Sequence, residues 1–243
     1  MEKRSEKPRK AGITSLHDVG VTVQNLSSIL NDYSQFIDIA KFGVGTALIA
    51  PNLKEKIILY KDYGVEVYFG GTLFEKFYYN NEIDKYFEFL RRNEITLVEI
   101  SNGTINISLD ERTKIVEKYG SEFKFFGEVG SKDAESIMSP SKWIKEIKQL
   151  LDAGCEYIIT EGRDSGTAGL YRASGEIRTG LLQEIVDNID VNRLIFEAPT
   201  SKAQMYFINN IGSNVNLGNI NPYDVLLLEA QRQGLRSETF QCT

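Results

Sequence analysis

Short apolar runs, rich in β-branched and aromatic residues, recur along the whole chain. Most of them lack the strict alternation of apolar and polar residues that marks a half-exposed strand. Such runs are typical of strands covered on both faces, as parallel strands are. Strands are predicted at Gly12–His17, Phe36–Phe42, Val65–Phe69, Thr96–Ser101, Phe123–Val129, Glu156–Glu161, Arg193–Glu197 and Asn214–Asn219.

Helical patterns separate these runs. The segment Asn52–Tyr63 carries apolar residues at helical spacing and is followed by Gly64, a frequent helix stop. Ser108 with Glu111 three residues later has the form of a capping box, which marks the start of another helix. Helices are predicted at Asn52–Tyr63, Glu82–Asn93, Ser108–Tyr119, Ser141–Ala153, Leu181–Asn188, Lys202–Asn210 and Tyr223–Gln233.

Strand and helix alternate eight times, about 30 residues apart, with no linker between them. Eight such units favour a closed barrel over an open doubly wound sheet. We therefore predict an α/β fold, a single-domain (β/α)8 TIM barrel over residues 11–243 with a basic N-terminal arm. That arm, residues 1–10, is the one separable segment; we expect it to be flexible, and packing over the closed end of the barrel is the alternative.

Charge and composition narrow the class of protein. The chain is 42% hydrophobic, far too apolar for a disordered protein. The net charge of −6 argues against a general nucleic-acid-binding role. No apolar run approaches the roughly 20 residues that a membrane span needs, and none follows the basic arm as a signal peptide would require. Cys155 and Cys242 make no disulfide framework, so we expect a reduced, cytoplasmic protein.

Polar residues collect where the predicted strands end. In a barrel these ends converge on one mouth, and active sites lie there. The residues at or just after the strand ends include Asp18, Lys41, Gly70, Gly71, Glu75, Glu99, Glu128, Lys132, Glu161, Arg163, Asp164, Glu197, Asn216 and Asn219.

Four of these residues, Glu99, Glu128, Glu161 and Glu197, are carboxylates that each close an apolar run. Any one of them could simply cap a helix or bind a backbone amide. Crowded together they would repel, so cations or a metal ion must compensate them. The cations available at the strand ends are Lys41, Lys132 and Arg163.

The kind of metal can also be narrowed. The chain has one histidine, His17, and no cysteine pair, so zinc, copper and iron–sulfur sites lack ligands. Carboxylate and amide oxygens suit a hard ion such as Mg²⁺. We interpret His17 as a packed or solvated side chain rather than a catalytic base.

Two glycine-rich segments leave alternatives open. Gly70-Gly71-Thr72 could cradle an anion with backbone amides or form a tight turn after its strand. The segment Gly162–Gly180 is long and polar, as mobile lids often are, but a passive surface loop has the same composition.

Eight strings stand in order along almost the entire chain: KFGVGT (41–46), GGTLFEK (70–76), EISNG (99–103), EVGSKDAE (128–135), EGRDSG (161–166), IFEAP (195–199), NVNLGNI (214–220) and GLRSETF (234–240). Several are uncommon, and their joint order makes the match specific. Together they resemble the phosphosulfolactate synthase family, and the chain is similar to a bacterial-type member. Val19, Val44 and Asn102 depart from residues common in that family.

The resemblance implies a carbon–sulfur lyase that uses Mg²⁺ to add sulfite to phosphoenolpyruvate, giving (2R)-phospho-3-sulfolactate. That product leads to coenzyme M in methanogens and to sulfolactate in some spore-forming bacteria. Two alternatives remain: an aldolase-like barrel acting on a phosphorylated keto or enol acid, with Lys41 or Lys132 as a Schiff-base lysine, and a non-catalytic heat-stress-associated homologue.

Residue roles follow from the resemblance and the chemistry together. The lysine of the family's E-V-G-x-K motif falls on Lys132, which we expect to act as general acid, with Glu128 as its catalytic partner. The substrates, phosphoenolpyruvate and sulfite, are both anions; we expect Lys41, Arg163, Gly70, Gly71 and Asn216 to bind them. Mg²⁺ is expected on Glu161, Glu197 and Glu99. We further expect a homo-oligomer, with neither nucleic acid nor membrane as partner.

Overall fold

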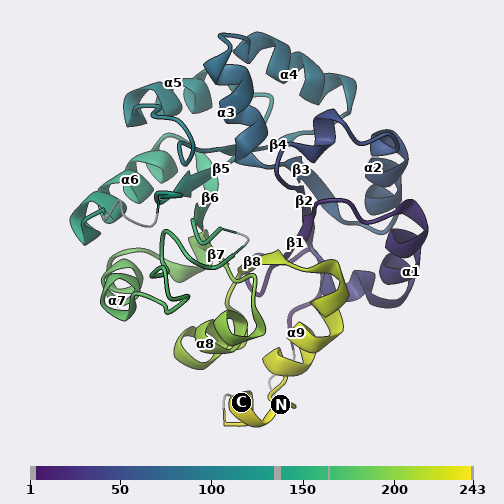
Figure 1. Ribbon diagram of the computed structural model, residues 1–243, viewed down its shortest axis with the longest axis vertical. Helices are drawn as coiled ribbons and strands as arrows, with labels where there is room; N and C mark the ends of the chain where they lie inside the picture. The colour runs from purple at the N-terminus through teal and green to yellow at the C-terminus, as the bar shows by residue number, and fades with distance from the viewer. Residues whose placement is uncertain (1–3, 134–137, 164, 242–243) are drawn as a thin grey trace.

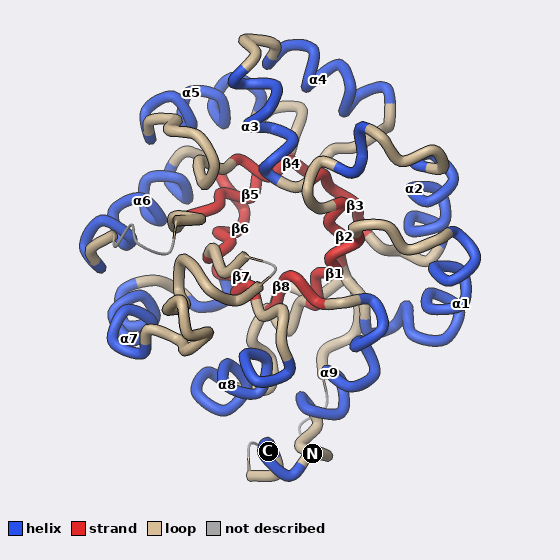
Figure 2. Tube along the Cα trace, viewed as in Figure 1, coloured by secondary structure: helices blue, strands red, loops and turns tan. Residues whose placement is uncertain are grey.

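The computed structural model describes residues 4–133, 138–163 and 165–241. Within these residues, eight parallel strands pair in chain order and the last closes the ring onto the first (Figure 2). The predicted TIM-type barrel is therefore confirmed. The strands are β1 (Thr14–Asp18), β2 (Ile39–Phe42), β3 (Glu66–Phe69), β4 (Leu97–Ile100), β5 (Lys124–Val129), β6 (Cys155–Thr160), β7 (Leu194–Glu197) and β8 (Leu217–Ile220).

The helices form an outer ring around the barrel (Figure 1). Local signals fix several of their starts: Ser108 and Glu111 make the predicted capping box, and Ser139 caps the helix after β5. The helices are α1 (Val23–Tyr33), α2 (Leu53–Asp62), α3 (Gly71–Tyr79), α4 (Ile83–Arg92), α5 (Leu109–Tyr119), α6 (Pro140–Asp152), α7 (Thr179–Asn188), α8 (Ser201–Ile211) and α9 (Val225–Arg232).

Two of these helices are absent from the sequence-based prediction. In α1 the buried residues Leu26, Ile29 and Leu30 do follow helical spacing, but the polar residues between them mask the pattern. The α3 helix begins at Gly71 and takes Gly70 as its N-cap, so a pair of glycines that resembles a turn starts a helix instead. Both helices complete the βα alternation.

The core has two layers. Inside the barrel, side chains from the strands pack on one another near its amino-terminal half, with Tyr68, Phe126 and Tyr157 in edge-to-face contact. Outside, a larger apolar layer joins the strands to the helices. Side chains fill the amino-terminal half of the barrel interior, so among the described residues the space for a pocket lies towards the carboxyl ends of the strands.

The N-terminal arm packs over the amino-terminal end of the barrel. The side chain of Arg4 is 8% exposed and contacts Glu229 and Asp38, and Arg9 donates to Asp38 at 2.9 Å. Lys7 donates to the Ser34 carbonyl at 3.2 Å. Residues 4–10 therefore contact the amino-terminal end of the barrel, and the flexibility expected for the arm stays a prediction. Residues 1–3, Asp164 and Cys242 lie outside the described residues.

No helix in the part of the chain that the structure describes is both long enough and apolar enough to cross a bilayer.

Candidate active site

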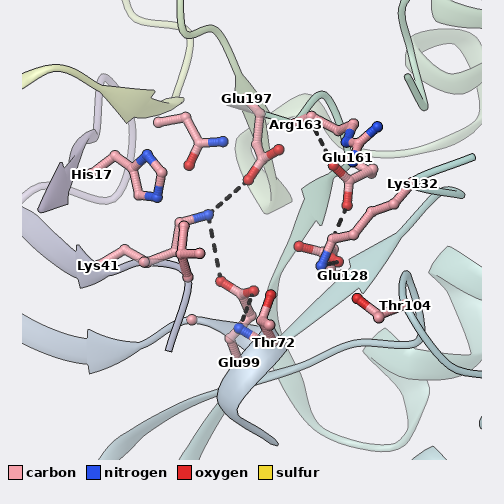
Figure 3. Close-up of a pocket in the computed structure, with 15 residues that line it drawn as sticks. His17, Lys41, Thr72, Glu99, Thr104, Glu128, Lys132, Glu161, Arg163 and Glu197 are labelled. Carbon is pink, nitrogen blue, oxygen red and sulfur yellow. Dashed lines mark hydrogen bonds and ion pairs between the residues drawn. The ribbon is translucent and has the colours of Figure 1, made fainter. Parts of the chain in front are cut away.

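The carboxyl ends of the strands surround a pocket of about 310 Å³ (Figure 3). Each strand contributes a residue from its last positions or from the positions just after it. The predicted convergence of charge is confirmed, since the pocket is lined by Lys41, Glu99, Glu128, Lys132, Glu161, Arg163 and Glu197. A pocket of this size and polarity suits one or two small charged molecules.

Lys41 lies on β2, inside the barrel, and is 6% exposed. Its Nζ donates to Glu197 Oε1 at 2.7 Å and lies 3.8 Å from Glu99 Oε2. Burial lowers the pKa of Lys41, but the two carboxylates outweigh that cost and hold its pKa well above the ordinary value. Lys41 is therefore a fixed ammonium group between β4 and β7.

Lys132 follows β5 and reaches into the other side of the pocket. Its Nζ lies 3.6 Å from Glu75 Oε1, 3.6 Å from Glu128 Oε1 and 3.9 Å from Glu161 Oε2. Burial alone would lower the pKa of Lys132. The carboxylates raise it by more than burial lowers it, so its pKa lies above that of a free lysine. The side chain is thus held as a protonated amine.

Three carboxylates keep one buried oxygen without a hydrogen-bond partner in the described residues. Glu99 Oε1 accepts from Gly71 N at 2.6 Å and Glu161 Oε1 from Arg163 N at 2.6 Å, while the second oxygen of each has no hydrogen bond. Glu128 Oε1 has none either, and each of the three oxygens lies 3.6–3.9 Å from a lysine Nζ. Buried polar atoms are rarely left so, and at a pocket they indicate a ligand, a water or an ion.

Burial decides the protonation of two of these groups. It raises the pKa of Glu99 to about 8, with Lys41 opposing and Glu128 adding to the shift. It also raises the pKa of Glu161 well above the usual value, again with Glu128 adding to the effect. Glu197 differs: burial would raise its pKa, but Lys41 overcomes that and lowers it. At neutral pH the pocket is therefore less negative than its count of glutamates implies.

Glu197 does not fit the expected metal-ligand set. Its Oε1 accepts from Lys41, and its Oε2 accepts from Gly162 N at 2.9 Å. Both oxygens are therefore occupied by protein donors. Of the expected ligands, Glu99 and Glu161 keep an unpartnered oxygen, and Glu128 has the same property.

Gly70 and Gly71 line the pocket, but Gly71 is not an open anion cradle. Its amide already donates to Glu99, and a Cβ on Gly71 would lie 2.3 Å from Ser101 Oγ and 2.7 Å from Glu99 Oε1. The glycine is required for this close packing of the α3 start against β4. The predicted alternatives, cradle or turn, are both replaced by a helix N-terminus.

Asn216 lies away from the pocket, against the prediction that it binds substrate. Its Oδ1 accepts from Ile13 N at 2.9 Å, and its Nδ2 donates to the carbonyls of Asn192 and Leu194. These partners lie where β1 and β7 begin, at the opposite end of the barrel. Asn219 lines the pocket instead, with a buried Oδ1 that has no partner in the described residues.

Arg163 lines the pocket from the start of the loop after β6 and adopts a left-handed backbone (φ 57°). The middle of that loop packs back onto the barrel. Tyr171, fully buried, donates to the Glu197 carbonyl at 2.5 Å, and Leu170 N donates to the Glu161 carbonyl at 2.9 Å. The loop is therefore anchored beside two pocket glutamates rather than forming a free flap.

Other residues that the sequence analysis names without a site role also line or support the pocket. Thr72, from the Gly70-Gly71-Thr72 segment, lines it, as does Thr104, which no sequence pattern marks. His17 lines it as well, with its ring against Gly43, where an added Cβ would lie 1.8 Å from Nε2. Glu75 stands beside the pocket, four residues after the start of α3, and its position soon after the end of β3 was the signal for it.

The fold and the pocket together define a TIM-barrel enzyme whose mouth is lined by charged side chains of both signs. Solved structures agree on the fold alone: the YdjI aldolase from Escherichia coli K12 superposes with a TM-score of 0.57 at 9% identity, covering 93% of this chain and 80% of that one. The 3-hexulose-6-phosphate synthase from Salmonella typhimurium gives 0.56 at 11% identity, covering 95% and 100%.

Sequence comparisons identify the family. Residues 2–238 match the model for (2R)-phospho-3-sulfolactate synthase (ComA), and the chain belongs to that family. It is 41% identical to the phosphosulfolactate synthase of Bacillus subtilis over 98% of this chain and 95% of the relative. The corresponding figures for the phosphosulfolactate synthase of Methanothermobacter thermautotrophicus are 38%, 97% and 94%. Protein HEAT-STRESS-ASSOCIATED 32 of Arabidopsis thaliana is 23% identical over 89% of this chain and 84% of its own.

Proposed function

We propose that this protein adds sulfite to phosphoenolpyruvate to give (2R)-phospho-3-sulfolactate, as a Mg²⁺-dependent carbon–sulfur lyase of the cytoplasm. The observation that carries the proposal is the gathering of Lys41, Lys132 and Arg163 with four glutamates in one pocket, in a chain whose residues 2–238 match the family. Two anionic substrates repel each other, and the three cations that line the pocket offset that repulsion.

The proposed chemistry begins with the sulfur lone pair of sulfite. It attacks the methylene carbon of phosphoenolpyruvate and forms the C–S bond, while the π electrons of the C=C bond move towards the substrate carboxylate. Lys41 and Arg163 would hold the anionic groups, since both present positive charge to the pocket. Placing the two reactants side by side in this way removes much of the entropic cost of the reaction.

A proton must then reach C2 from one face, which sets the configuration of the product. Lys132 is the proposed donor because it is protonated, partly buried and held by carboxylates on several sides. Glu128, at 3.6 Å, would orient its ammonium group and favour its reprotonation from water. No covalent bond between enzyme and substrate is needed in this sequence of steps.

The donor atoms of the pocket fit a hard divalent cation. The unpartnered oxygens of Glu99, Glu128 and Glu161 are the ligand type that Mg²⁺ prefers. No cluster of three metal-binding side chains is preformed among the described residues, so one or two of these carboxylates would hold the ion, with substrate and water completing its shell. When bound, Mg²⁺ would act as a Lewis acid that offsets the charge developing on the substrate carboxylate.

The aldolase alternative is disfavoured by the state of the two lysines. A Schiff-base lysine must lose its proton, so its pKa is usually lowered. The pKa values of Lys41 and Lys132 are instead raised by neighbouring carboxylates. The non-catalytic alternative is disfavoured by the higher identity to the synthases than to the heat-stress-associated protein.

The direct test is to mix the protein with phosphoenolpyruvate, sulfite and Mg²⁺ and to follow phosphorus by ³¹P NMR. We expect a new phosphate-ester signal whose formation needs all three additions and stops when a chelator removes the metal. Absence of product at high enzyme concentration would refute the assignment. Full turnover in chelator would remove the metal from the mechanism, and a borohydride-trapped adduct would favour the aldolase.

A further inference from the structure

Glu75 is a buried glutamate next to the pocket that takes no part in the chemistry proposed above. It lies in the first turns of α3 and is 2% exposed. Its carboxylate accepts hydrogen bonds from Ser101 Oγ, from Gly103 N at 3.2 Å, from Thr104 N at 2.7 Å and from Ile105 N at 2.9 Å. With four donors on two oxygens, this carboxylate organises the segment after β4, residues 101–105.

That segment forms a wall for the side chain of Lys132. A Cβ placed on Gly103 would lie 2.7 Å from Cδ and 2.8 Å from Cε and Cγ of Lys132, closer than real side chains approach. The methylene stem of the lysine therefore lies flat against the Gly103 backbone. Since Glu75 holds Gly103 N, it fixes the surface on which the lysine rests.

Glu75 also acts on the ammonium group directly. Glu75 Oε1 lies 3.6 Å from Lys132 Nζ, as close as Glu128 Oε1 does. The stem is thus confined by the segment that Glu75 holds, and the charged end faces Glu75 itself. Small displacements of a reacting group carry large costs in rate, about 100-fold for about 1 Å.

We propose that Glu75 is a positioning residue, which sets the place of Lys132 Nζ in the pocket through residues 101–105 and through its own charge. The role assigned to Lys132 rests on the proposed function. Glu75→Gln keeps the volume, but it turns an NH₂ group towards backbone N–H donors and removes the charge that faces the lysine. The lysine should then lose its fixed position while the barrel stays folded.

Glu111 provides a matched control. It is also a glutamate that accepts hydrogen bonds from a backbone amide and hydroxyl groups, those of Ser108 and Tyr78, but it lies exposed on α5 outside the pocket. We expect Glu75→Gln to lower kcat by about 10- to 100-fold with a change in KM below about twofold. Glu75→Asp, which keeps the charge, should recover part of the loss, and Glu111→Gln should leave kcat unchanged.

A double-mutant cycle separates positioning from general loosening of the structure. In a Lys132→Ala background there is no lysine to misplace, so Glu75→Gln should lower the residual rate by less than about twofold. An equal loss in both backgrounds would show independent effects and overturn the proposal. So would a kcat of Glu75→Gln equal to that of the wild type.

Should the wild type show no turnover, the proposed function fails and the cycle is read from unfolding midpoints instead. Glu75→Gln, Lys132→Met and the double variant need only a fluorescence or circular-dichroism melt. Non-additive shifts of the midpoint support the coupling of the two side chains, and additive shifts overturn it.

Discussion

Both ends of the barrel bury a cluster of charged side chains, and the two clusters differ in how they are satisfied. At the amino-terminal end, Arg232 donates to the carbonyls of Ser213 and Val215, both at 2.7 Å, and Arg4 joins the acids Asp38 and Glu229. At the carboxyl end, three buried glutamate oxygens have no hydrogen-bond donor within the described residues.

The difference indicates that the amino-terminal cluster stabilises the fold, whereas the pocket cluster is arranged for function. The amino-terminal cluster directs its terminal guanidinium donors to carboxylates and backbone carbonyls and leaves only Nε of Arg4 and of Arg232 without a hydrogen bond among the described residues, so it ties the arm to strand starts far apart in the chain. The pocket instead crowds carboxylates whose pKa values burial raises, an arrangement that costs folding energy and leaves polar atoms facing the space for a ligand. Functional sites commonly store such cost, and the remainder of the fold compensates it.

The largest expected effect concerns the pocket end. Lys132→Ala removes the proposed proton donor, and we expect turnover to fall by about 10²–10⁴-fold while the circular-dichroism spectrum is unchanged. Steady-state rates with phosphoenolpyruvate and sulfite measure it. Lys118→Ala is the control, because Lys118 is an exposed lysine ion-paired with Asp84 at 3.4 Å, far from the pocket. A near-normal rate for Lys132→Ala would displace Lys132 from the acid role.

The next largest effect is a loss of stability at the amino-terminal end of the barrel. Arg4→Ala leaves two buried acids, Asp38 and Glu229, short of a partner, and we expect the free energy of unfolding to drop by about 3 kcal/mol with kcat unchanged. Urea unfolding followed by fluorescence measures the loss. Arg236→Ala is the matched control, since its ion pair with Glu238 is solvent-exposed and should contribute under about 1 kcal/mol. If Arg4→Ala lowered kcat without lowering stability, the contrast between the two ends would be wrong.

The sequence carried enough information for the barrel and for the convergence of charge. Buried parallel strands appear in the sequence as apolar runs, and polar residues near the end of a run face the mouth, so Lys41, Glu99 and Glu197 can be placed from strand order alone. The exact bounds of a strand are harder to predict. The sequence predicts one strand over Asn214–Asn219, but β8 begins at Leu217, and the amide side chain at the mouth is Asn219 rather than Asn216.

Contacts between distant segments could not be read from the sequence at all. Arg4 belongs to a basic segment with the composition of a solvated tail. Only the fold shows that it contacts Asp38 and Glu229 at the amino-terminal end of the barrel. Glu75 looks like an ordinary helix residue until the backbone amides after β4 are seen to converge on it. Such roles depend on neighbours more than twenty residues away, which local patterns do not encode.

The smallest expected effect is on the pH dependence of stability at the pocket end of the barrel. Burial raises the pKa of Glu99 from its ordinary value of 4.5 to about 8, so the folded chain binds this proton more tightly than the unfolded chain. The stability from this group is therefore complete below about pH 4.5 and is lost as the pH rises through 8. Glu99→Gln cannot lose a proton, and its carbonyl can still accept from Gly71 N.

Urea midpoints measured in chelator from pH 5 to pH 9 test this expectation. The variant should gain on the wild type as the pH rises and level off above about pH 8. Glu94→Gln should run parallel to the wild type, because Glu94 is exposed and pairs only at the surface with Lys61. Curves for Glu99→Gln that stay parallel to the wild type would mean that the pocket carboxylates carry no folding cost. In that case the contrast between the two ends of the barrel would rest on their hydrogen-bond geometry and not on a cost in folding energy at the mouth.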